Sequence, residues 1–240
     1  MPRKTTPWLM LISRIVIFFA AQSIFALGIY LAGSTAAWEG SANWWPLTVT
    51  AANLVILALL IGLFRSEGKR YWEIFRFERR HIKGDLLALL AATALSAPLS
   101  YLPNVMLGTW LFGSPEATLD LFVRPLPLWA VYAAIVVFPI TQGLTELPTY
   151  FGYVMPRLEA QGIRKWLAIS LPALMLGLQH IAAPLLFDIN FITWRALMFI
   201  PFAFFLGIFF HWRPRMLPYF VIIHVLMNMS FATMFLSVAF

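Results

Sequence analysis

The chain has 240 residues, of which 61% are hydrophobic and only 11% are charged. A typical soluble domain carries about a quarter charged residues. A soluble fold of this length could not hide so much apolar surface from water. The composition therefore excludes a soluble globular domain and predicts an all-α, polytopic bundle of transmembrane helices whose first partner is the lipid bilayer.

The net charge of +7 does not indicate a nucleic-acid partner, because the basic residues fall in the gaps between apolar stretches. We therefore predict no nucleic acid as a partner. The chain contains no cysteine, which excludes disulfides, thiol catalysis and thiolate metal ligands. No oligomeric state is predicted from the sequence.

Seven stretches come close to the roughly 20 apolar residues that a membrane-spanning helix needs. They are 8–31, 46–64, 86–107, 126–150, 166–187, 194–210 and 217–240. Prolines interrupt several of them, and we expect kinks or helix ends there because proline removes a backbone donor. The sequence thus predicts a bundle of about seven spans.

The gaps between these stretches alternate in charge. One set of gaps contains Arg3, Lys4, Arg65, Lys69, Arg70, Arg76, Arg79, Arg80, Lys83, Arg157, Arg164, Lys165, Arg213 and Arg215. The other set contains only Arg124 and Arg195 among its basic residues, beside Glu39, Glu116, Asp120 and Asp188. The positive-inside rule places the first set in the cytoplasm. The N-terminus is then cytoplasmic and the C-terminus lies outside, in a pattern that suits the cytoplasmic membrane of a prokaryote.

The chain divides into two regions by content. Residues 1–125 hold the N-terminal spans and a cytoplasmic segment near 66–85 that is both basic and aromatic. Such a composition predicts an interfacial helix on the inner leaflet, with a solvated loop that carries scattered aromatics as the alternative. Residues 126–240 hold most of the titratable residues that fall inside the expected spans.

Charged or titratable side chains inside a span are costly, and they mark functional sites by default. Within the expected spans these are Arg14, Glu146, His180 and His224. Arg14 lies near the cytoplasmic end of the first span, where its side chain can snorkel toward the headgroups. Glu146 is the one carboxylate inside any expected span, so it is the first candidate for chemistry.

Three of these spans bring polar groups to a similar depth. With a helical rise of about 1.5 Å per residue, Glu146 lies roughly 16 Å from the nearest cytoplasmic arginine, His180 roughly 24 Å and His224 roughly 14 Å. Asn228 follows His224 at the i+4 position and shares its helix face. Each residue alone could be an ordinary contact between helices. Together they predict one buried polar site.

This set of side chains suits the hydrolysis of an amide bond. A carboxylate beside a neutral imidazole can hold a water molecule and take its proton. A second histidine and an asparagine on one helix face could donate hydrogen bonds to the developing oxyanion. Two histidines and one glutamate also form a known catalytic zinc set. A divalent metal such as zinc, held by Glu146, His180 and His224, is therefore kept as an alternative; no other cofactor is expected.

The same residues resemble the motifs of the CPBP family of intramembrane proteases, which includes the CAAX prenyl endopeptidases. The family's first motif, Glu-Glu-x-x-x-Arg-Gly-Tyr followed by Pro-Arg-Leu, aligns with residues 146–153 and 156–158. The second motif, Phe-x-x-x-His, aligns with 176–180, where the apolar Leu176 stands in place of the Phe, and the third, His-x-x-x-Asn, aligns with 224–228.

The resemblance covers roughly residues 126–240 and implies an intramembrane endopeptidase that cuts membrane-bound, prenylated or peptide substrates. By this resemblance Glu146 and His180 would activate water. His224 and Asn228 would stabilise the oxyanion.

Two positions of the first motif depart from the family pattern, since its second Glu is Leu147 here and its Arg is Phe151. These positions are i, i+4 neighbours, so the family's two charges could pair with each other. Losing both together leaves no orphan charge, and apolar residues can replace a buried pair at little cost. A non-catalytic scaffold or an immunity-type protein of the same fold is the alternative that this loss favours. A proton-coupled carrier, with Glu146 and the histidines as its relay, is a third.

Overall fold

The structure, a computed structural model, describes residues 4–240; Arg3, counted above among the cytoplasmic charges, lies outside the described residues. The longer helices are α1 (Thr6–Leu31), α3 (Trp45–Ser66), α4 (Ile82–Phe112), α6 (Leu128–Leu147), α8 (Lys165–Leu178), α9 (Ile189–Leu197), α10 (Ile200–Trp212) and α11 (Leu217–Ala232). Shorter helices are α2 (Ala37–Asn43), α5 (Glu116–Phe122) and α7 (Met155–Ala160). The described residues form no β-strand, which confirms the all-α prediction.

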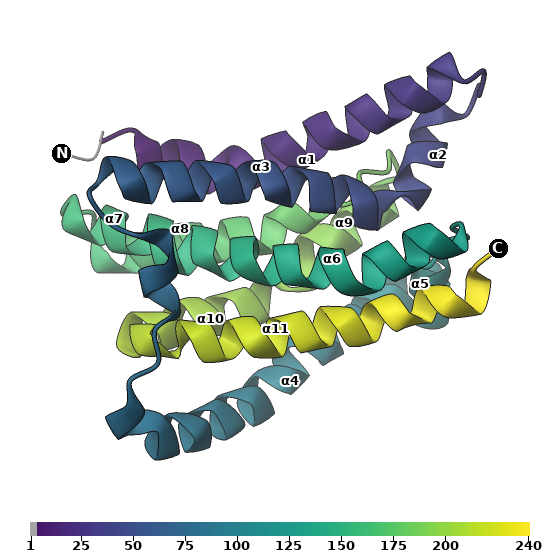
Figure 1. Ribbon diagram of the computed structural model, residues 1–240. Coiled ribbons are helices and arrows are strands. Elements are labelled where there is room, and N and C mark those ends of the chain that lie inside the picture. Colours follow the sequence, from purple (N-terminus) through teal and green to yellow (C-terminus); the bar gives the residue numbers. More distant parts are fainter. Residues whose placement is uncertain (1–3) are drawn as a thin grey trace.

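Six helical segments in the described part of the chain are long and apolar enough to cross a membrane: Thr6–Leu31, Trp45–Ser66, Tyr71–Phe112, Leu128–Ala160, Ile189–Trp212 and Pro214–Val238. They account for six of the seven expected stretches. The remaining stretch, 166–187, contains the 14-residue helix α8 and the short turn η4 (Gln179–Ala182). The start of α1 and the C-terminus lie at opposite ends of the bundle (Figure 1), as an odd number of passes requires. The prediction of about seven spans is consistent with this arrangement.

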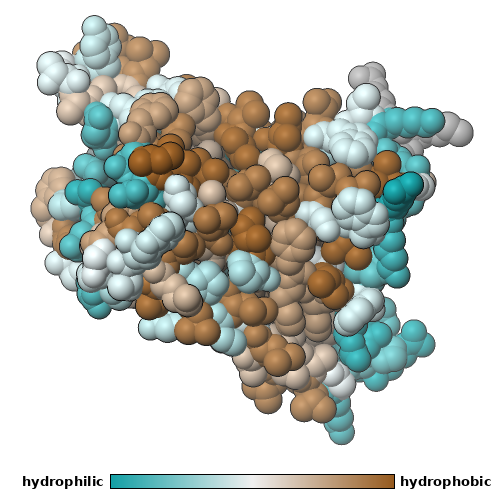
Figure 2. Space-filling view, turned by 180° about the vertical axis from the view of Figure 1, so that it is seen from behind, coloured by the Kyte–Doolittle hydropathy of each residue, from teal (hydrophilic) through white to brown (hydrophobic). Residues whose placement is uncertain are grey.

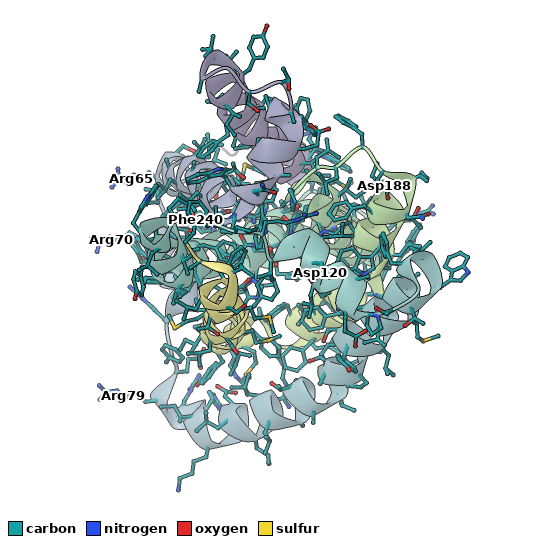
Figure 3. The ribbon with its side chains drawn as sticks, turned by 90° about the vertical axis from the view of Figure 1, so that its right-hand side faces the viewer. Arg65, Arg70, Arg79, Asp120, Asp188 and Phe240 are labelled. Carbon is teal, nitrogen blue, oxygen red and sulfur yellow. The ribbon has the colours of Figure 1, made fainter. Side chains whose placement is uncertain are left out.

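Helix α6 lies at the centre of the packing, with α3 against one side and α11 against another (Figure 1). Helix α1 packs on α3, and α8 packs on α10. Seen from the end that carries Phe240, α4 lies at the outside of the bundle, where it contacts α9 and α10 (Figure 3). The largest apolar cluster takes residues from both halves of the chain, so the regions 1–125 and 126–240 share one core.

The outer surface is dominated by apolar side chains. Figure 2 shows a broad apolar middle, with hydrophilic residues gathered toward the end that carries the N-terminus and again at the opposite end. Large side chains such as Leu87, Trp110 and Met106 are about two-thirds exposed or more. A soluble monomer rarely exposes so extensive an apolar surface, and the distribution is that of helices facing lipid.

The segment near 66–85 differs from the single interfacial helix that its composition predicts. It forms two short turns, η1 (Tyr71–Phe75) and η2 (Arg79–His81), joined by extended residues. Tyr71 is buried, and its hydroxyl donates a hydrogen bond to the carbonyl of Leu144 in α6. Tyr71 therefore packs in the core, and the backbone around it does not form a continuous surface helix.

Candidate active site

Glu146 lies in the last turn of α6, immediately before a change in helix geometry. Pro148 has no backbone N–H and cannot donate to Leu144, four residues earlier. The freed carbonyl of Leu144 accepts the Tyr71 hydroxyl instead. From Pro148 to Val154 the chain forms a π-helical segment, η3, before α7 continues. Such π-helical turns are frequent at functional sites, and here one directly follows the candidate catalytic carboxylate.

The Glu146 carboxylate is almost completely enclosed, with 3% of the residue exposed. Its Oε1 atom lies 3.3 Å from Nε2 of His224 in α11. Its Oε2 atom accepts a hydrogen bond from the side-chain amide of Gln142, one turn earlier in α6. A guanidinium nitrogen of Arg14 lies 3.7 Å from the same Oε2 atom. The two carboxylate oxygens therefore face different partners.

Arg14 does not snorkel toward the headgroups; that interpretation is wrong. Its side chain is fully buried, and it donates to Oε1 of Gln179 and, over 3.0 Å, to Oε1 of Gln142. An arginine side chain is long enough to point toward the headgroups or into the bundle from the same backbone position. The buried amides and the carboxylate of Glu146 offer hydrogen-bond partners that decide the direction.

His180 lies in η4, where α8 has already ended, and its imidazole lines the cavity described below. Its Nδ1 atom is 3.0 Å from the carbonyl oxygen of Gly177, so a neutral ring that donates from Nδ1 keeps Nε2 free as an acceptor. The backbone carbonyl of His180 accepts from Arg195 of α9 over 2.9 Å, and that of Ala183 accepts from the same guanidinium over 2.7 Å. Arg195 thus fixes the helix end that carries His180. Arg195, counted above among the charges of a gap, falls at the start of the expected stretch 194–210.

His224 and Asn228 share one face of α11, as their spacing predicts. The Asn228 amide nitrogen donates to the His224 carbonyl over 2.8 Å and lies 3.2 Å from its Nε2 atom. The Nε2 atom of His224 is thus between an amide donor and the Glu146 carboxylate. It can donate to the carboxylate or accept from the amide, but not both at once.

All four predicted catalytic residues line one cavity of about 370 Å³. Ligand pockets commonly have volumes of about 300–1,000 Å³ and apolar walls with a few convergent polar groups. The polar and titratable groups of this wall are Gln142, Glu146, His180, Arg195, His224 and Asn228, together with Ser100, Tyr101, Asn104 and Thr118. The remaining wall is mostly aromatic and aliphatic, which suits a peptide segment with apolar side chains.

No group of three or more His, Cys, Asp or Glu residues in residues 4–240 is arranged to hold a metal ion. The metal alternative at Glu146, His180 and His224 gains no support from this geometry. We derive no chemical step through a metal.

The fold and the cavity together define a polytopic membrane protein with a buried carboxylate–imidazole site. Residues 127–230 match the family model described as Type II CAAX prenyl endopeptidase Rce1-like. The chain therefore carries an Rce1-like domain, which confirms the resemblance to the CPBP family. No match was found among curated proteins or among solved structures.

The matched region contains Glu146, His180, His224 and Asn228. Arg14, which contacts Glu146, lies outside it.

Sequence reasoning missed the neutral amides around Glu146. Asn53 of α3 donates to Oε1 of Gln142 over 2.8 Å, and its own carbonyl oxygen accepts from Thr145 over 3.0 Å. Gln179, beside His180, accepts from Arg14. Uncharged amides inside a span are ordinary helix contacts. The signal that could have found Gln142 is its position one turn before Glu146, on the same helix face.

Proposed function

We propose that this chain is an intramembrane endopeptidase in which Glu146 and His180 activate a water molecule. The observation that carries the proposal is the convergence of Glu146, His180, His224 and Asn228 on one cavity, from three separate parts of the bundle. The Rce1-like domain supports a protease function in general terms. The roles of the individual residues and the substrate are our inference.

The proposed reaction begins with a water molecule held between Glu146 and His180. Glu146 accepts a proton while the water oxygen attacks the carbonyl carbon of the scissile peptide bond. Negative charge develops on the carbonyl oxygen, where hydrogen bonds from His224 and Asn228 stabilise it. The C–N bond then breaks, and the proton held by Glu146 passes to the leaving amine. One water is consumed, and a carboxylate and an amine are formed.

The substrates that we propose are membrane-bound segments or lipid-modified peptides. The cavity is surrounded by helices with apolar outer faces, and its wall is largely apolar. We further propose that the protein lies in the cytoplasmic membrane of a prokaryote with its N-terminus in the cytoplasm.

The two motif departures leave no unpaired charge behind. Leu147 and Phe151 are both buried, and the Phe151 ring packs against Phe210 with centroids 5.2 Å apart. Apolar side chains thus occupy both positions, as expected if two charges were lost together. This packing supports an intact site, and the non-catalytic scaffold is the alternative outcome of the test below.

Purified protein, incubated with a library of membrane-proximal and prenylated peptides, tests the proposal. Products are followed by mass spectrometry for the wild type and for Glu146→Ala, each with and without chelator. Cleavage that depends on Glu146 and survives chelation supports the proposal. Loss with chelator would instead assign the chemistry to a metal. Cleavage that survives Glu146→Ala would contradict the proposed role of Glu146. Folded wild type that cuts nothing in the library would favour the non-catalytic function.

A further inference from the structure

A buried polar network stands behind Glu146, on the side away from the open cavity. It contains Arg14 of α1, Asn53 of α3, Gln142 of α6 and Gln179 of η4, and of these only Gln142 also lines the cavity. We propose that Arg14 is a positioning residue that holds the Glu146 carboxylate in its reactive orientation through Gln142. This inference rests on the proposed function and adds a residue outside the Rce1-like domain to the site.

The hydrogen bonds around Gln142 allow only one orientation of its side-chain amide. Its Oε1 atom accepts hydrogen bonds from Arg14 over 3.0 Å and from Asn53 over 2.8 Å. A carbonyl oxygen has two acceptor positions, so both are occupied. The NH₂ group must then point the other way, and it donates to Oε2 of Glu146. Arg14 and Asn53 together therefore fix which end of Gln142 meets the carboxylate.

The two carboxylate oxygens of Glu146 have different partners. Oε2 is engaged by Gln142 and lies 3.7 Å from the Arg14 guanidinium. Oε1 lies 3.3 Å from His224 Nε2, among the groups that line the cavity. One oxygen is thus restrained from behind, and the other is presented to the place where water and substrate would sit. A carboxylate held at one end cannot rotate away from the reaction.

The positive charge beside the Glu146 carboxylate comes from the N-terminal part of the protein. At position 151, where the family motif has arginine, Phe151 packs against Phe210 and offers no cation. The guanidinium beside Glu146 comes instead from α1. Arg14 is fully buried and stacks over the Phe18 ring at 4.8 Å, and its Nη1 atom has no hydrogen-bond partner. A buried, incompletely bonded cation is costly as a purely structural element, and the Glu146 carboxylate that it faces offsets part of that cost.

Kinetics of Arg14→Met and Arg14→Lys test the proposal. Arg14 does not line the cavity, so we expect kcat of Arg14→Met to fall about 100-fold while KM stays within about twofold of the wild type. Arg14→Lys keeps the charge but loses the planar fork, so its kcat should lie between the two. The matched control is Arg215→Met, which removes a guanidinium 2.9 Å from the buried carboxylate of Asp85, away from the cavity. Unchanged kcat in folded Arg14→Met, or an equal fall in the control, would overturn the proposal.

A thermal-melting cycle tests the same pair without any need for cleavage. Arg14→Met leaves the Glu146 carboxylate without its cation, so the melting temperature should fall. Adding Glu146→Gln removes the stranded charge and should recover much of that fall. Two losses that simply add would overturn the proposed coupling. Recovery in a protein whose wild type cuts no peptide would count against the proposed function alone, and would leave Arg14 as the partner of Glu146.

Discussion

Gly143 of α6 lies against Val221 and Val225 of α11, and replacing it with alanine should move Glu146 away from His224. A Cβ atom added at Gly143 would lie 2.3 Å from Cγ2 of Val225 and 3.4 Å from the carbonyl oxygen of Val221. Nonbonded carbons are comfortable at about 3.5–4.0 Å, so the pair must move apart by about 1.2 Å or more. Val225 is β-branched and has little rotamer freedom in a helix, so α11 itself must shift.

That shift would act directly on the distance between Glu146 and His224, which is 3.3 Å. Overpacking of this kind costs about 1–3 kcal/mol, and a misplacement of about 1 Å can lower a catalysed rate about 100-fold. We expect Gly143→Ala to melt several degrees lower and to lose most of its kcat. The assay is peptide cleavage in detergent, together with thermal melting of the same preparation.

A second substitution separates this explanation from a general defect. Val225→Ala removes the clashing methyl, so Gly143→Ala/Val225→Ala should regain stability and rate. Gly62→Ala in α3 is the matched control, because nothing lies within 4 Å of the added Cβ. The reasoning would be refuted by Gly143→Ala that melts and cleaves like the wild type, or by a double variant no better than the single one.

Two further predictions concern the ends of the bundle. Burial alone would raise the pKa of the Glu67 carboxyl, but the hydrogen bonds and charge of Arg157, at 2.8 and 2.5 Å, outweigh burial and hold that pKa below its ordinary value. Because the Glu67 pKa is lower in the folded than in the unfolded protein, the Arg157–Glu67 pair stabilises the fold at pH values above the unfolded-state pKa. That stabilisation is lost as the pH falls through the folded-state pKa. The melting temperature of Glu67→Gln should therefore depend less on acid than that of the wild type, and an unchanged pH dependence would contradict this role of the pair. Because the chain has no cysteine, single cysteines at Arg79 and Asp120 can report topology: an impermeant thiol reagent added outside intact cells should label position 120 and not 79, and the reverse pattern would invert the proposed orientation.

Much of the fold could be predicted because a membrane constrains composition so strongly. Hydropathy located six long helical segments, and the alternation of charge anticipated termini at opposite ends of the bundle. The early end of α8 was not predictable in the same way, because residues 166–187 remain apolar beyond Leu178. The helix ends there in a turn whose carbonyls accept from Arg195, a contact from a distant part of the sequence.

The candidate site was partly predictable for a related reason. Glu146, His180 and His224 stand out because titratable groups are rare inside spans, and the structure places all three on one cavity. Arg14 was misinterpreted because a distance along the chain says how far a residue is from the membrane surface, but not which way its side chain points. Gln142 carries no charge, so its importance emerges only once its hydrogen-bond partners are known.

The most direct test of the account is the value of kcat/KM for Glu146→Gln on the best peptide substrate of the wild type. Glutamine keeps the size of the side chain and one acceptor oxygen, but it cannot accept a proton from water. We predict a fall of about 100- to 10,000-fold, the usual contribution of a general base, in a protein that still folds but melts below the wild type because the Arg14 guanidinium loses its carboxylate. A folded Glu146→Gln protein that cleaves within a few-fold of the wild type would contradict the central claim.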